Sequence, residues 1–348
     1  MHRILIYGAN GYTGQLIVEA LALRGFKPVL AGRNRDALEA LAQKFRLTRR
    51  VFELGEPAEI ARNLDGIELL LNCAGPFSKT CEPLLEACLA LKVHYLDITG
   101  EIDVFALCHH AHNRARHQGV VVAPGIGFDV VPTDCLAAML KQRLADASEL
   151  VLAFEATGGP SPGTARTSVE GLAKGGRVRR DGQLVDVPLA FKTREFERNG
   201  QRRTAMTIPW GDVYTAYVST GIANIEVYMT VSPKTVARMR WLRHAQPLLR
   251  FEPLRKFFES RAVARAQGPD AERRRTSGCT IWGEVRNAAG REVKLMLTTP
   301  NGYALTASAA LGIVKRVLDA APAGGYYTPS QLMGPEYVLG LPGVTLIG

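Results

Sequence analysis

The segment that decides the fold lies at the start of the chain and reads RILIYGANGYTG, residues 3–14. Its apolar start, Arg3–Tyr7, predicts a short buried strand, and the amphipathic stretch Tyr12–Leu23 predicts a helix directly after it. Glycines at this place allow a tight turn, let the backbone approach a pyrophosphate, and leave the first N–H groups of the helix available to it. The segment therefore predicts a dinucleotide site, with a mononucleotide or a degenerate site as the alternative. Its residues are Gly8, Asn10, Gly11, Tyr12, Thr13 and Gly14.

The first 123 residues repeat this alternation of short aliphatic runs and amphipathic stretches, which is typical of a parallel sheet with crossover helices. Further strands are predicted at Pro28–Ala31, Val51–Glu53, Ile67–Asn72, Val93–Asp97 and Val120–Ala123. Further helices are predicted at Asp36–Phe45, Cys81–Leu91 and Ile102–His117. We therefore expect an α/β protein whose first domain, residues 1–124, is a Rossmann domain with a doubly wound parallel sheet.

The pattern changes after Pro124, where the turn PGIGFDVVP leads into a helix predicted at Thr133–Leu144 and then into mainly strand-like runs. The pairs Asp181-Gly182 and Asn199-Gly200 indicate β-hairpins, because Asp or Asn followed by Gly tolerates positive φ angles. These features predict a second, α+β domain over residues 125–300, with an antiparallel sheet.

The remaining segment, residues 301–348, contains a predicted buried helix at Ala304–Leu318. We expect this helix to pack back on the first domain.

The end of the second predicted strand reads VLAGRN, and this position distinguishes NAD from NADP. A carboxylate here would bind the ribose 2′-OH of NAD, whereas the 2′-phosphate of NADP needs a cation. Arg33 stands where the carboxylate would be expected, and a guanidinium can bind a phosphate through two hydrogen bonds. We therefore expect NADP as the cofactor, with Arg33 and Asn34 in its site. A solvated arginine near a turn is the alternative.

The fourth predicted strand breaks into four small residues at the edge of the sheet where the nicotinamide ring would lie: Cys73, Ala74, Gly75 and Pro76. Small side chains leave room for a ring, so we include these residues in the cofactor site. An ordinary turn between a strand and a helix would use the same residue types.

The composition argues against several other functions. The net charge of +10 is concentrated in residues 236–276, with 11 Lys and Arg against 4 Asp and Glu. Because no nucleic-acid motif accompanies it, no nucleic-acid partner is expected. The start of the chain does not resemble a signal peptide, and no apolar run is long enough to span a bilayer, so we expect a cytoplasmic protein.

Neither the cysteines nor the histidines form a recognisable metal motif. The six cysteines show no CxxC spacing, so we interpret them as small buried side chains and not as a disulfide framework or zinc site. A histidine cluster falls within one predicted helix, away from the sheet edge where chemistry occurs, and we interpret it as a solvated helix face and expect no metal. Its members are His109, His110, His112 and His117.

Large apolar and cationic residues interleave between Val236 and Arg275. The apolar ones are Trp241, Leu242, Leu248, Leu249, Phe251, Leu254, Phe257 and Phe258, and the cationic ones are Arg238, Arg240, Arg243, Arg250, Arg255 and Lys256. Pro247 and Pro253 predict two or three short helices instead of one long helix. Peripheral contact with an anionic membrane, or with an acyl-carrying partner, would use both kinds of side chain. The alternative is a helical arm that covers the core of the second domain and leaves a solvated basic face.

Five motifs occur in a fixed order along the chain: GANGYTG, LAGRN, NCAGPF, HYLDITGE and GFDVVPTD. Together with NGYALTASAAL and GGYYTPSQL near the C-terminus, they resemble the saccharopine dehydrogenase-like oxidoreductases, which include the trans-acting enoyl reductases. The resemblance implies a Rossmann domain, an inserted substrate domain whose sheet often mediates dimerisation, and a C-terminal helix that returns to the first domain. It therefore implies a homodimer, but it does not specify the substrate, because activities in the group are diverse.

Extended short-chain dehydrogenases also begin with a glycine-rich turn. They need a Tyr and a Lys four positions apart as proton donor and partner, and none of the ten tyrosines has a Lys at that spacing. This class is therefore disfavoured.

The catalytic candidates are Asp129 and Glu101, because both follow a predicted strand at the carboxyl edge of the sheet. By resemblance, the GFDVVPTD stretch that contains Asp129 lines the junction between the cofactor and substrate domains. As alternatives, Glu101 begins a helix, where a carboxylate favours the dipole, and polar turn residues bind backbone N–H groups. The segment with Thr164, Arg166 and Ser168 is either an anion-binding loop for a small-molecule substrate or a capped flexible loop.

These observations predict an NADPH-dependent oxidoreductase that reduces a C=C, C=N or C=O group. The alternative is a non-catalytic dinucleotide-binding scaffold at a membrane surface.

Overall fold

The computed structural model describes residues 3–198, 200–249 and 251–347. The chain forms two compact units, each with its own sheet. The first unit contains Met1–Val131 and Tyr303–Gly334, and the second contains Pro132–Gly302 and Pro335–Gly348. The C-terminal segment is thus divided between the two units.

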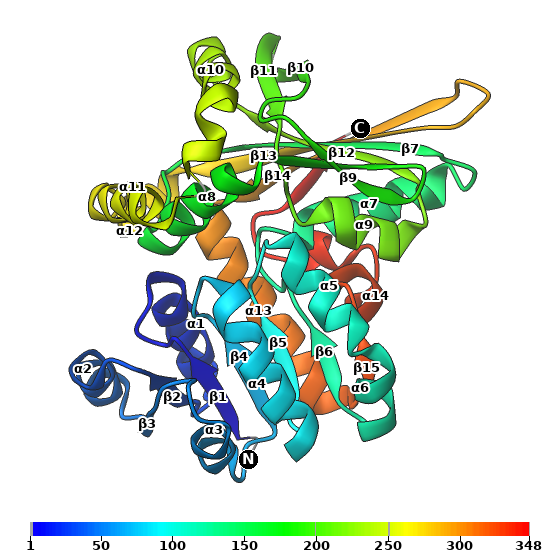
Figure 1. Cartoon of the computed structure of the whole chain (residues 1–348). Coiled ribbons are helices and arrows are strands. Elements are labelled where there is room, and N and C mark those ends of the chain that lie inside the picture. The colour runs from blue at the N-terminus through cyan, green and yellow to red at the C-terminus, as the bar shows by residue number, and fades with distance from the viewer. Residues whose placement is uncertain (1–2, 199, 250, 348) are drawn as a thin grey trace. The chain divides into compact units, whose positions relative to one another are not determined.

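The first unit is built on a seven-stranded sheet in which every pairing is parallel (Figure 1). Its strands are β1 (Ile4–Tyr7), β2 (Val29–Gly32), β3 (Arg49–Val51), β4 (Leu69–Asn72), β5 (His94–Asp97), β6 (Val121–Ala123) and β15 (Gly325–Tyr326). Their order is β15-β6-β5-β4-β1-β2-β3, so the chain reverses direction across the sheet between β1 and β4. All residues of β1 and β4 are buried, as expected for strands covered on both faces. The predicted doubly wound fold is confirmed.

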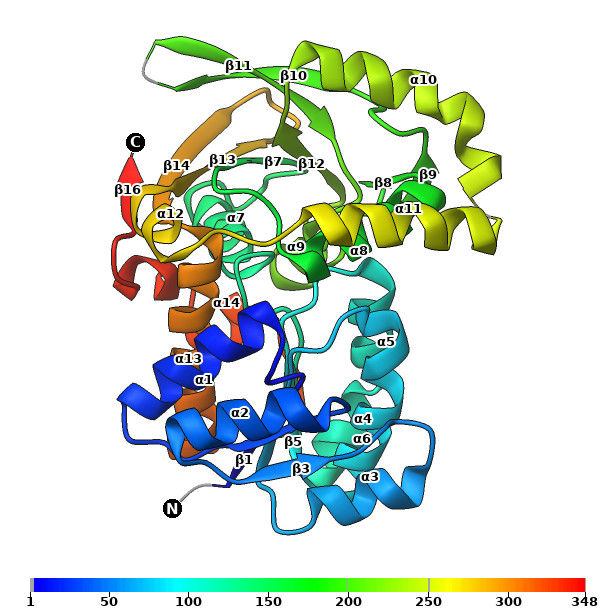
Figure 2. The same cartoon turned by 90° about the vertical axis from the view of Figure 1, so that its left-hand side faces the viewer.

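Helices cover both faces of this sheet, with α1, α2 and α13 on one face and α3 to α6 on the other (Figures 1 and 2). The helices of the unit are α1 (Tyr12–Leu23), α2 (Arg35–Phe45), α3 (Pro57–Leu64), α4 (Phe77–Leu91), α5 (Ile102–His110), α6 (His112–Gln118), α13 (Gly302–Ala320) and α14 (Pro329–Met333). Helix α1 has the predicted bounds, whereas the predicted helix Ile102–His117 is divided into α5 and α6 at Ala111. Helix α3 was not predicted.

The second unit is built on a nine-stranded mixed sheet. Its strands are β7 (Glu149–Ala156), β8 (Gly176–Arg180), β9 (Gln183–Val187), β10 (Thr193–Arg198), β11 (Gln201–Thr207), β12 (Asn224–Thr230), β13 (Gly278–Arg286), β14 (Glu292–Pro300) and β16 (Thr345–Ile347). The prediction of an antiparallel sheet is wrong in one place, because β7 and β12 pair in parallel. The two hairpins form as predicted, β8–β9 across Asp181-Gly182 and β10–β11 next to Gly200; Asn199 lies outside the described residues.

The helices of the second unit are α7 (Val131–Arg143), α8 (Pro162–Lys174), α9 (Asp212–Thr220), α10 (Pro233–Leu249), α11 (Glu252–Arg265) and α12 (Ala271–Thr276), with a 3-10 turn at Tyr337–Gly340. Helices α7 and α9 are joined by a hydrogen bond of 2.6 Å from the Ser219 hydroxyl to the buried Asp134 carboxylate. Across the described ranges, no helix combines the length and the apolar character that crossing a membrane requires.

Candidate functional site

The glycine turn between β1 and α1 is so tight that two of its glycines admit no side chain. Gly8 has φ +81°, and a Cβ added there would stand 2.8 Å from the backbone nitrogen of Ala74, at the end of the neighbouring strand β4. A Cβ at Gly14 would stand 2.4 Å from the carbonyl oxygen of Gly8. At Gly11 the only neighbour within 4 Å would be that same carbonyl, at 3.2 Å. Gly8 and Gly14 are therefore required by packing, whereas a Cβ at Gly11 would need only a small shift of the Gly8 carbonyl.

The N-terminus of α1 is not capped by a side chain, because its N-cap residue is Gly11. The N–H groups of Thr13 and Gly14 in the first helical turn therefore receive no capping oxygen, and the helix dipole there favours an anion. By contrast, the Asn34 side chain caps α2. The chemistry of this turn fits a pyrophosphate, as the sequence predicts.

Arg33 follows directly after β2, and its side chain is exposed at the carboxyl edge of the sheet. Burial raises the pKa of Tyr7 at the end of β1 to about 12, and the nearby Arg33 charge opposes this shift. Because Gly32 has no side chain, the Asn10 side chain can lie close to it. A Cβ added at Gly32 would be 3.2 Å from the Asn10 Oδ1. Asn10 and Arg33 thus flank the turn where a ribose 2′-phosphate would be bound. Asn34, predicted as a cofactor residue, caps α2 through an Oδ1 that accepts the Ala37 N–H at 3.0 Å.

The predicted nicotinamide segment, Cys73–Pro76, is held in one conformation by Asn72 and Thr80. The Asn72 Oδ1 accepts the Ala74 N–H at 3.0 Å, and the Thr80 hydroxyl donates to the Ala74 carbonyl at 2.7 Å. The same Thr80 oxygen accepts a hydrogen bond of 3.0 Å from Asn72 Nδ2. Pro76 is the N-cap of α4, so the segment is a turn between a strand and a helix that also leaves small residues at the sheet edge.

Glu101, the second catalytic candidate, binds the N-terminus of α4. Its two carboxylate oxygens accept the N–H groups of Phe77 at 2.8 Å and Ser78 at 2.9 Å. A carboxylate at a helix N-terminus is stabilised by the helix dipole, and both oxygens already have donors. Glu101 therefore ties the loop after β5 to the loop after β4, and this arrangement favours a positioning role over proton transfer.

Asp97 fixes the loop that carries Asp129. Its Oδ1 accepts the Thr99 and Gly125 N–H groups at 3.0 and 2.9 Å, and its Oδ2 accepts the Tyr95 hydroxyl at 2.9 Å. Burial raises the pKa of Asp97 to about 6 against these hydrogen bonds, which lower it. The loop after β6 is also held by a hydrogen bond of 2.9 Å from the Phe128 N–H to the Thr306 hydroxyl on α13.

Asp129 lies on this loop, half-buried against the loop after β5. A Cβ added at Gly100 would be 2.9 Å from its Oδ2, so the carboxyl group packs directly on the Gly100 backbone. Burial raises the pKa of Asp129 to about 7. A carboxyl group with this pKa can hold and release a proton near neutral pH, which is the property that a general acid requires.

Helix α13 contributes two residues that the sequence analysis missed. Tyr303 contacts the ring of Tyr12 edge to face at a centroid distance of 4.9 Å, and Thr306 holds the Asp129 loop. The motif NGYALTASAAL marked this helix, but only the structure shows that it borders the glycine turn.

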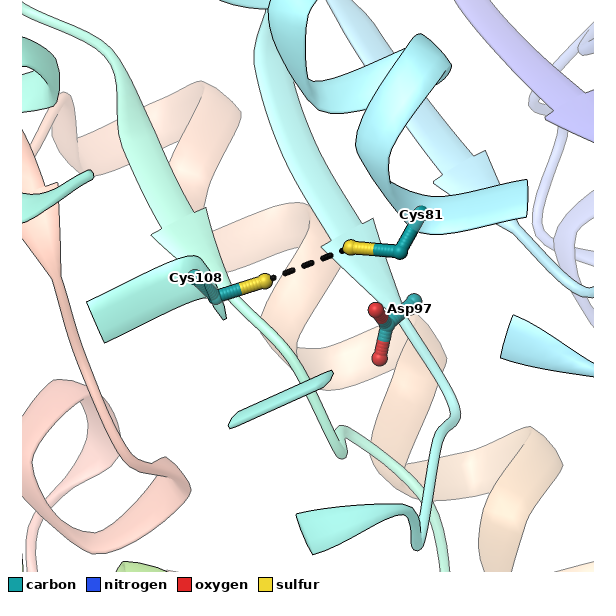
Figure 3. Close-up of side chains that lie close together, drawn as sticks. All are labelled: Cys81, Asp97 and Cys108. Atoms are coloured by element: carbon teal, nitrogen blue, oxygen red, sulfur yellow. Dashed lines mark hydrogen bonds between the residues drawn. The ribbon is translucent and has the colours of Figure 1, made fainter. Parts of the chain in front are cut away.

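Among the described residues, one buried group has ligand types that metals use: Cys81, Asp97 and Cys108 (Figure 3). The two sulfur atoms are 3.5 Å apart, and burial raises the pKa of the Cys108 thiol well above its ordinary value. The Asp97 carboxylate already accepts the three hydrogen bonds described above. We therefore interpret the group as core packing, in line with the burial of five of the six cysteines.

The prediction of a solvated histidine face is wrong for two of its members. The His109 ring contacts the Tyr326 ring at a centroid distance of 4.7 Å, and His112 Nδ1 accepts the Tyr326 N–H at 3.2 Å. Both histidines thus hold the edge strand β15, whereas His110 and His117 are exposed as predicted.

The predicted anion loop before α8 is occupied by its own capping bonds. The Ser161 hydroxyl accepts the Thr164 N–H at 3.2 Å and lies 3.0 Å from the Thr164 hydroxyl. Ser168 donates to the Thr164 carbonyl at 2.8 Å. These bonds favour the capped-loop alternative. Among the described residues, the structure shows no polar partner that would orient the Arg166 side chain toward a ligand.

Two surface hollows among the described residues contain none of the predicted site residues. A hollow of about 440 Å³ in the first unit lies next to the Glu86–Arg114 ion pair. A hollow of about 410 Å³ in the second unit lies over the sheet around Glu226 and is lined by paired charges. The glycine turn and the Asp129 loop therefore remain the candidate site.

Comparison with known proteins confirms the sequence resemblance. Residues 4–121 match the family described as Saccharopine dehydrogenase NADP binding domain. The chain is 26% identical over 204 residues to the saccharopine dehydrogenase-like oxidoreductase of Rattus norvegicus, a match that covers 51% of this chain and 48% of that protein. It is 30% identical over 156 residues to the trans-acting enoyl reductase of Mycobacterium ulcerans, a match that covers 41% of this chain and 36% of that protein. The matched segments thus span about half or less of these relatives.

Among solved structures, the apo saccharopine dehydrogenase (L-Glu forming) of Saccharomyces cerevisiae matches with a TM-score of 0.66 at 11% identity, over 100% of both chains. This similarity shows a shared fold. The family match covers the glycine turn, Arg33 and the segment after β4, and it confirms the predicted NADP-binding domain. Over residues 4–121, this chain is therefore similar to the family of saccharopine dehydrogenase NADP binding domains.

Proposed function

We propose that the chain is an NADPH-dependent reductase that acts on a C=C, C=N or C=O group of a small molecule. The observation that carries the proposal is the presence, at one edge of one sheet, of a glycine turn fitted for a pyrophosphate and an aspartic acid whose pKa is raised to about 7. A non-catalytic dinucleotide scaffold needs the first feature but not the second.

The residues divide into three roles in this proposal. The N–H groups at the start of α1 bind the pyrophosphate, Arg33 binds the 2′-phosphate, and Cys73–Pro76 leave space for the nicotinamide ring. When bound, NADPH supplies the hydride. Asp129 holds the proton that the reduced group takes up, because its burial against Gly100 keeps the acid form populated near pH 7.

Positioning of these groups falls to residues that do not touch the cofactor or substrate. Glu101 ties the two loops that follow β4 and β5, and Asp97 ties the end of β5 to the Asp129 loop. Such support matters because a displacement of about 1 Å at a reacting group can reduce the rate by about 100-fold.

The substrate class in this proposal follows the names of the relatives, since the trans-acting enoyl reductase of Mycobacterium ulcerans is named for reduction of an enoyl group. Imines derived from amino acids are the second class to test, because the proposal includes reduction of a C=N group. A cytoplasmic location is part of the proposal, because the described cysteines are all free thiols, which persist in reducing compartments.

The test is a screen of NADPH oxidation by absorbance, with enoyl thioesters, acyl thioesters and amino-acid-derived imines as acceptors. We expect one class to be reduced by the wild type and not by Asp129→Asn, while both proteins bind NADPH equally. NADPH binding without oxidation by any acceptor class would favour the scaffold. Equal turnover by Asp129→Asn would remove Asp129 from the chemistry.

A further inference from the structure

The second unit carries a helical arm, which we define as α10 and α11 (residues 233–249 and 252–265), joined near Phe251 (Figure 2). The segment forms separate helices instead of one long helix, as predicted, but α10 continues through Pro247, which does not interrupt it. The side chains of Pro247, Leu248 and Leu249, and the whole of Arg250, lie outside the described residues.

The inner face of the arm is packed. Val236 is buried in a cluster with Ala190 and Met206, and Met239 packs against the same cluster. The Arg243 guanidinium donates to the carbonyl groups of Leu189 and Ala190. Helix α11 packs along α8. The alternative drawn from the sequence, an arm that covers the core of the second domain, is therefore correct for this face.

The outer face of the arm exposes large aromatic side chains. Trp241 is 71% exposed, Phe251 65%, Phe257 51% and Phe258 43%. Elsewhere in the described residues, the most exposed aromatic side chains, Tyr217 and Phe191, reach only 37% and 36%. Large aromatic side chains are ordinarily buried when a protein folds. Several exposed together on one element therefore usually mark an interaction surface.

Cations accompany these aromatic residues. Helix α10 contains the exposed basic residues Lys234, Arg238 and Arg240 and no acidic residue; its remaining arginine, Arg243, binds the inner face. Lys234, Arg238 and Trp241 follow at helical spacing and are all exposed. In the described part of the chain, neither Arg238 nor Arg240 forms an ion pair, so both remain available to an external anion. On α11, the Arg261 guanidinium lies 5.0 Å from the centre of the Phe257 ring.

We propose that the outer face of the helical arm docks on an anionic lipid membrane. Aromatic side chains insert at the boundary between headgroups and acyl chains, and arginines bind lipid phosphates, so this face carries both elements of an interfacial anchor. A nucleic acid could stack its bases on aromatic side chains, but no nucleic-acid-binding motif accompanies this charge in the sequence. The proposal does not depend on the reductase activity.

The test is co-sedimentation of the full chain, without cofactor, with vesicles of phosphatidylcholine alone or of phosphatidylcholine with phosphatidylglycerol. We expect sedimentation with the anionic vesicles only, weakening as salt is added because screening reduces the attraction of phosphate for arginine. Absence from the pellet with anionic vesicles at low salt would overturn the proposal. Equal binding to neutral vesicles would overturn its electrostatic part.

Two pairs of variants locate the contact. Arg238→Gln with Arg240→Gln should weaken partitioning roughly 10- to 30-fold, because each cation near an anionic surface contributes several-fold. The matched control, Arg24→Gln with Lys27→Gln, removes two exposed cations in the first unit and should have no more than a small effect. Trp241→Ala should weaken binding about tenfold or more, whereas Leu23→Ala, which removes a side chain that is 79% exposed on α1, should not.

Equal losses in the arm and control variants would show a diffuse charge effect and overturn the assignment to the arm. Melting temperatures measured without vesicles control for misfolding. Retention of an acidic acyl-carrying protein by the arm, without any vesicle binding, would replace the membrane with a protein partner.

Discussion

Substitution of Gly11 by valine separates cofactor binding from folding. The Gly11 backbone, at φ −70° and ψ 161°, lies in the extended region that valine prefers, and only the Gly8 carbonyl approaches an added Cβ, at 3.2 Å. Loss of glycine at this N-cap should cost about 1 kcal/mol. This corresponds to a decrease in Tm of about 2–4 °C. The branched side chain would, however, project in front of the helix N-terminus, where the pyrophosphate must approach.

The stabilisation that NADPH binding should give the wild type follows from mass action. A ligand at 100 times its Kd stabilises the folded state by about 2.7 kcal/mol, which corresponds to a rise in Tm of roughly 5–10 °C. Gly11→Val should lose this rise while remaining folded. Thermal melts with and without NADPH measure both effects on the same sample.

Gly14→Val is the matched control for packing. Its Cβ would stand 2.4 Å from the Gly8 carbonyl oxygen and 3.0 Å from the Ala9 carbonyl oxygen, so the turn must shift even without ligand. We expect a loss of about 1–3 kcal/mol or more in the absence of NADPH. If NADPH raised the Tm of Gly11→Val as much as that of the wild type, the placement of the pyrophosphate would be refuted. A Tm of Gly11→Val without NADPH as low as that of Gly14→Val would also refute it.

Three further predictions concern the proposed chemistry and assembly. Because the pKa of Asp129 is raised to about 7 in the folded protein, the stability that its acid form contributes is fully present below about pH 4 and is lost as the pH rises through 7. The Tm of the wild type should therefore fall relative to that of Asp129→Asn over that range. The kcat of the wild type should also decrease above pH 7. If Tm and kcat of the variant depended on pH as those of the wild type do, both expectations would be contradicted. Glu101→Gln should lower Tm by weakening two hydrogen bonds to α4, at a cost of about 1–2 kcal/mol, and leave the shape of the pH–rate profile unchanged, whereas a 100-fold decrease in kcat at unchanged Tm would indicate direct proton transfer. A homodimer, expected from the family resemblance, should sediment at twice the 37.9 kDa chain mass, and a species of 37.9 kDa at micromolar concentration would oppose it.

The Rossmann architecture could be predicted because its signals are local. Strands buried on both faces read as aliphatic runs, and the glycine turn requires its residue types within seven positions, so β1, α1 and β4 were placed nearly at their observed bounds. Strand β3 was predicted two residues too late, because the charged residues Arg49 and Arg50 interrupt the apolar pattern expected of a strand. These arginines bind outside the strand, Arg49 to Glu39 and Arg50 to the Asn63 carbonyl. Helix α3 was not predicted, although Pro57 is favourable as the first residue of a helix.

The support of the site could not be predicted, because it depends on pairs of residues that are distant in the sequence. Glu101 binds the Phe77 N–H across 24 positions, and Thr306 binds the Phe128 N–H across 178 positions. No periodicity encodes such contacts. The parallel pairing of β7 with β12 is likewise determined by the whole second unit, because neither strand differs in pattern from an antiparallel one.

The central claim, that the N-terminal domain binds NADPH through the glycine turn and Arg33, is tested most directly by titrating the wild type, Arg33→Ala and Arg35→Ala with NADPH and NADH. Arg35→Ala removes a neighbouring exposed arginine at the start of α2 and is the matched control. We predict that the wild type binds NADPH more tightly than NADH and that Arg33→Ala reduces this ratio by about 5- to 150-fold, equivalent to the loss of about 1–3 kcal/mol from one charge-assisted contact with phosphate. Arg35→Ala should keep the wild-type ratio. Equal affinity of the wild type for the two cofactors, or a ratio unchanged in Arg33→Ala, would contradict the account.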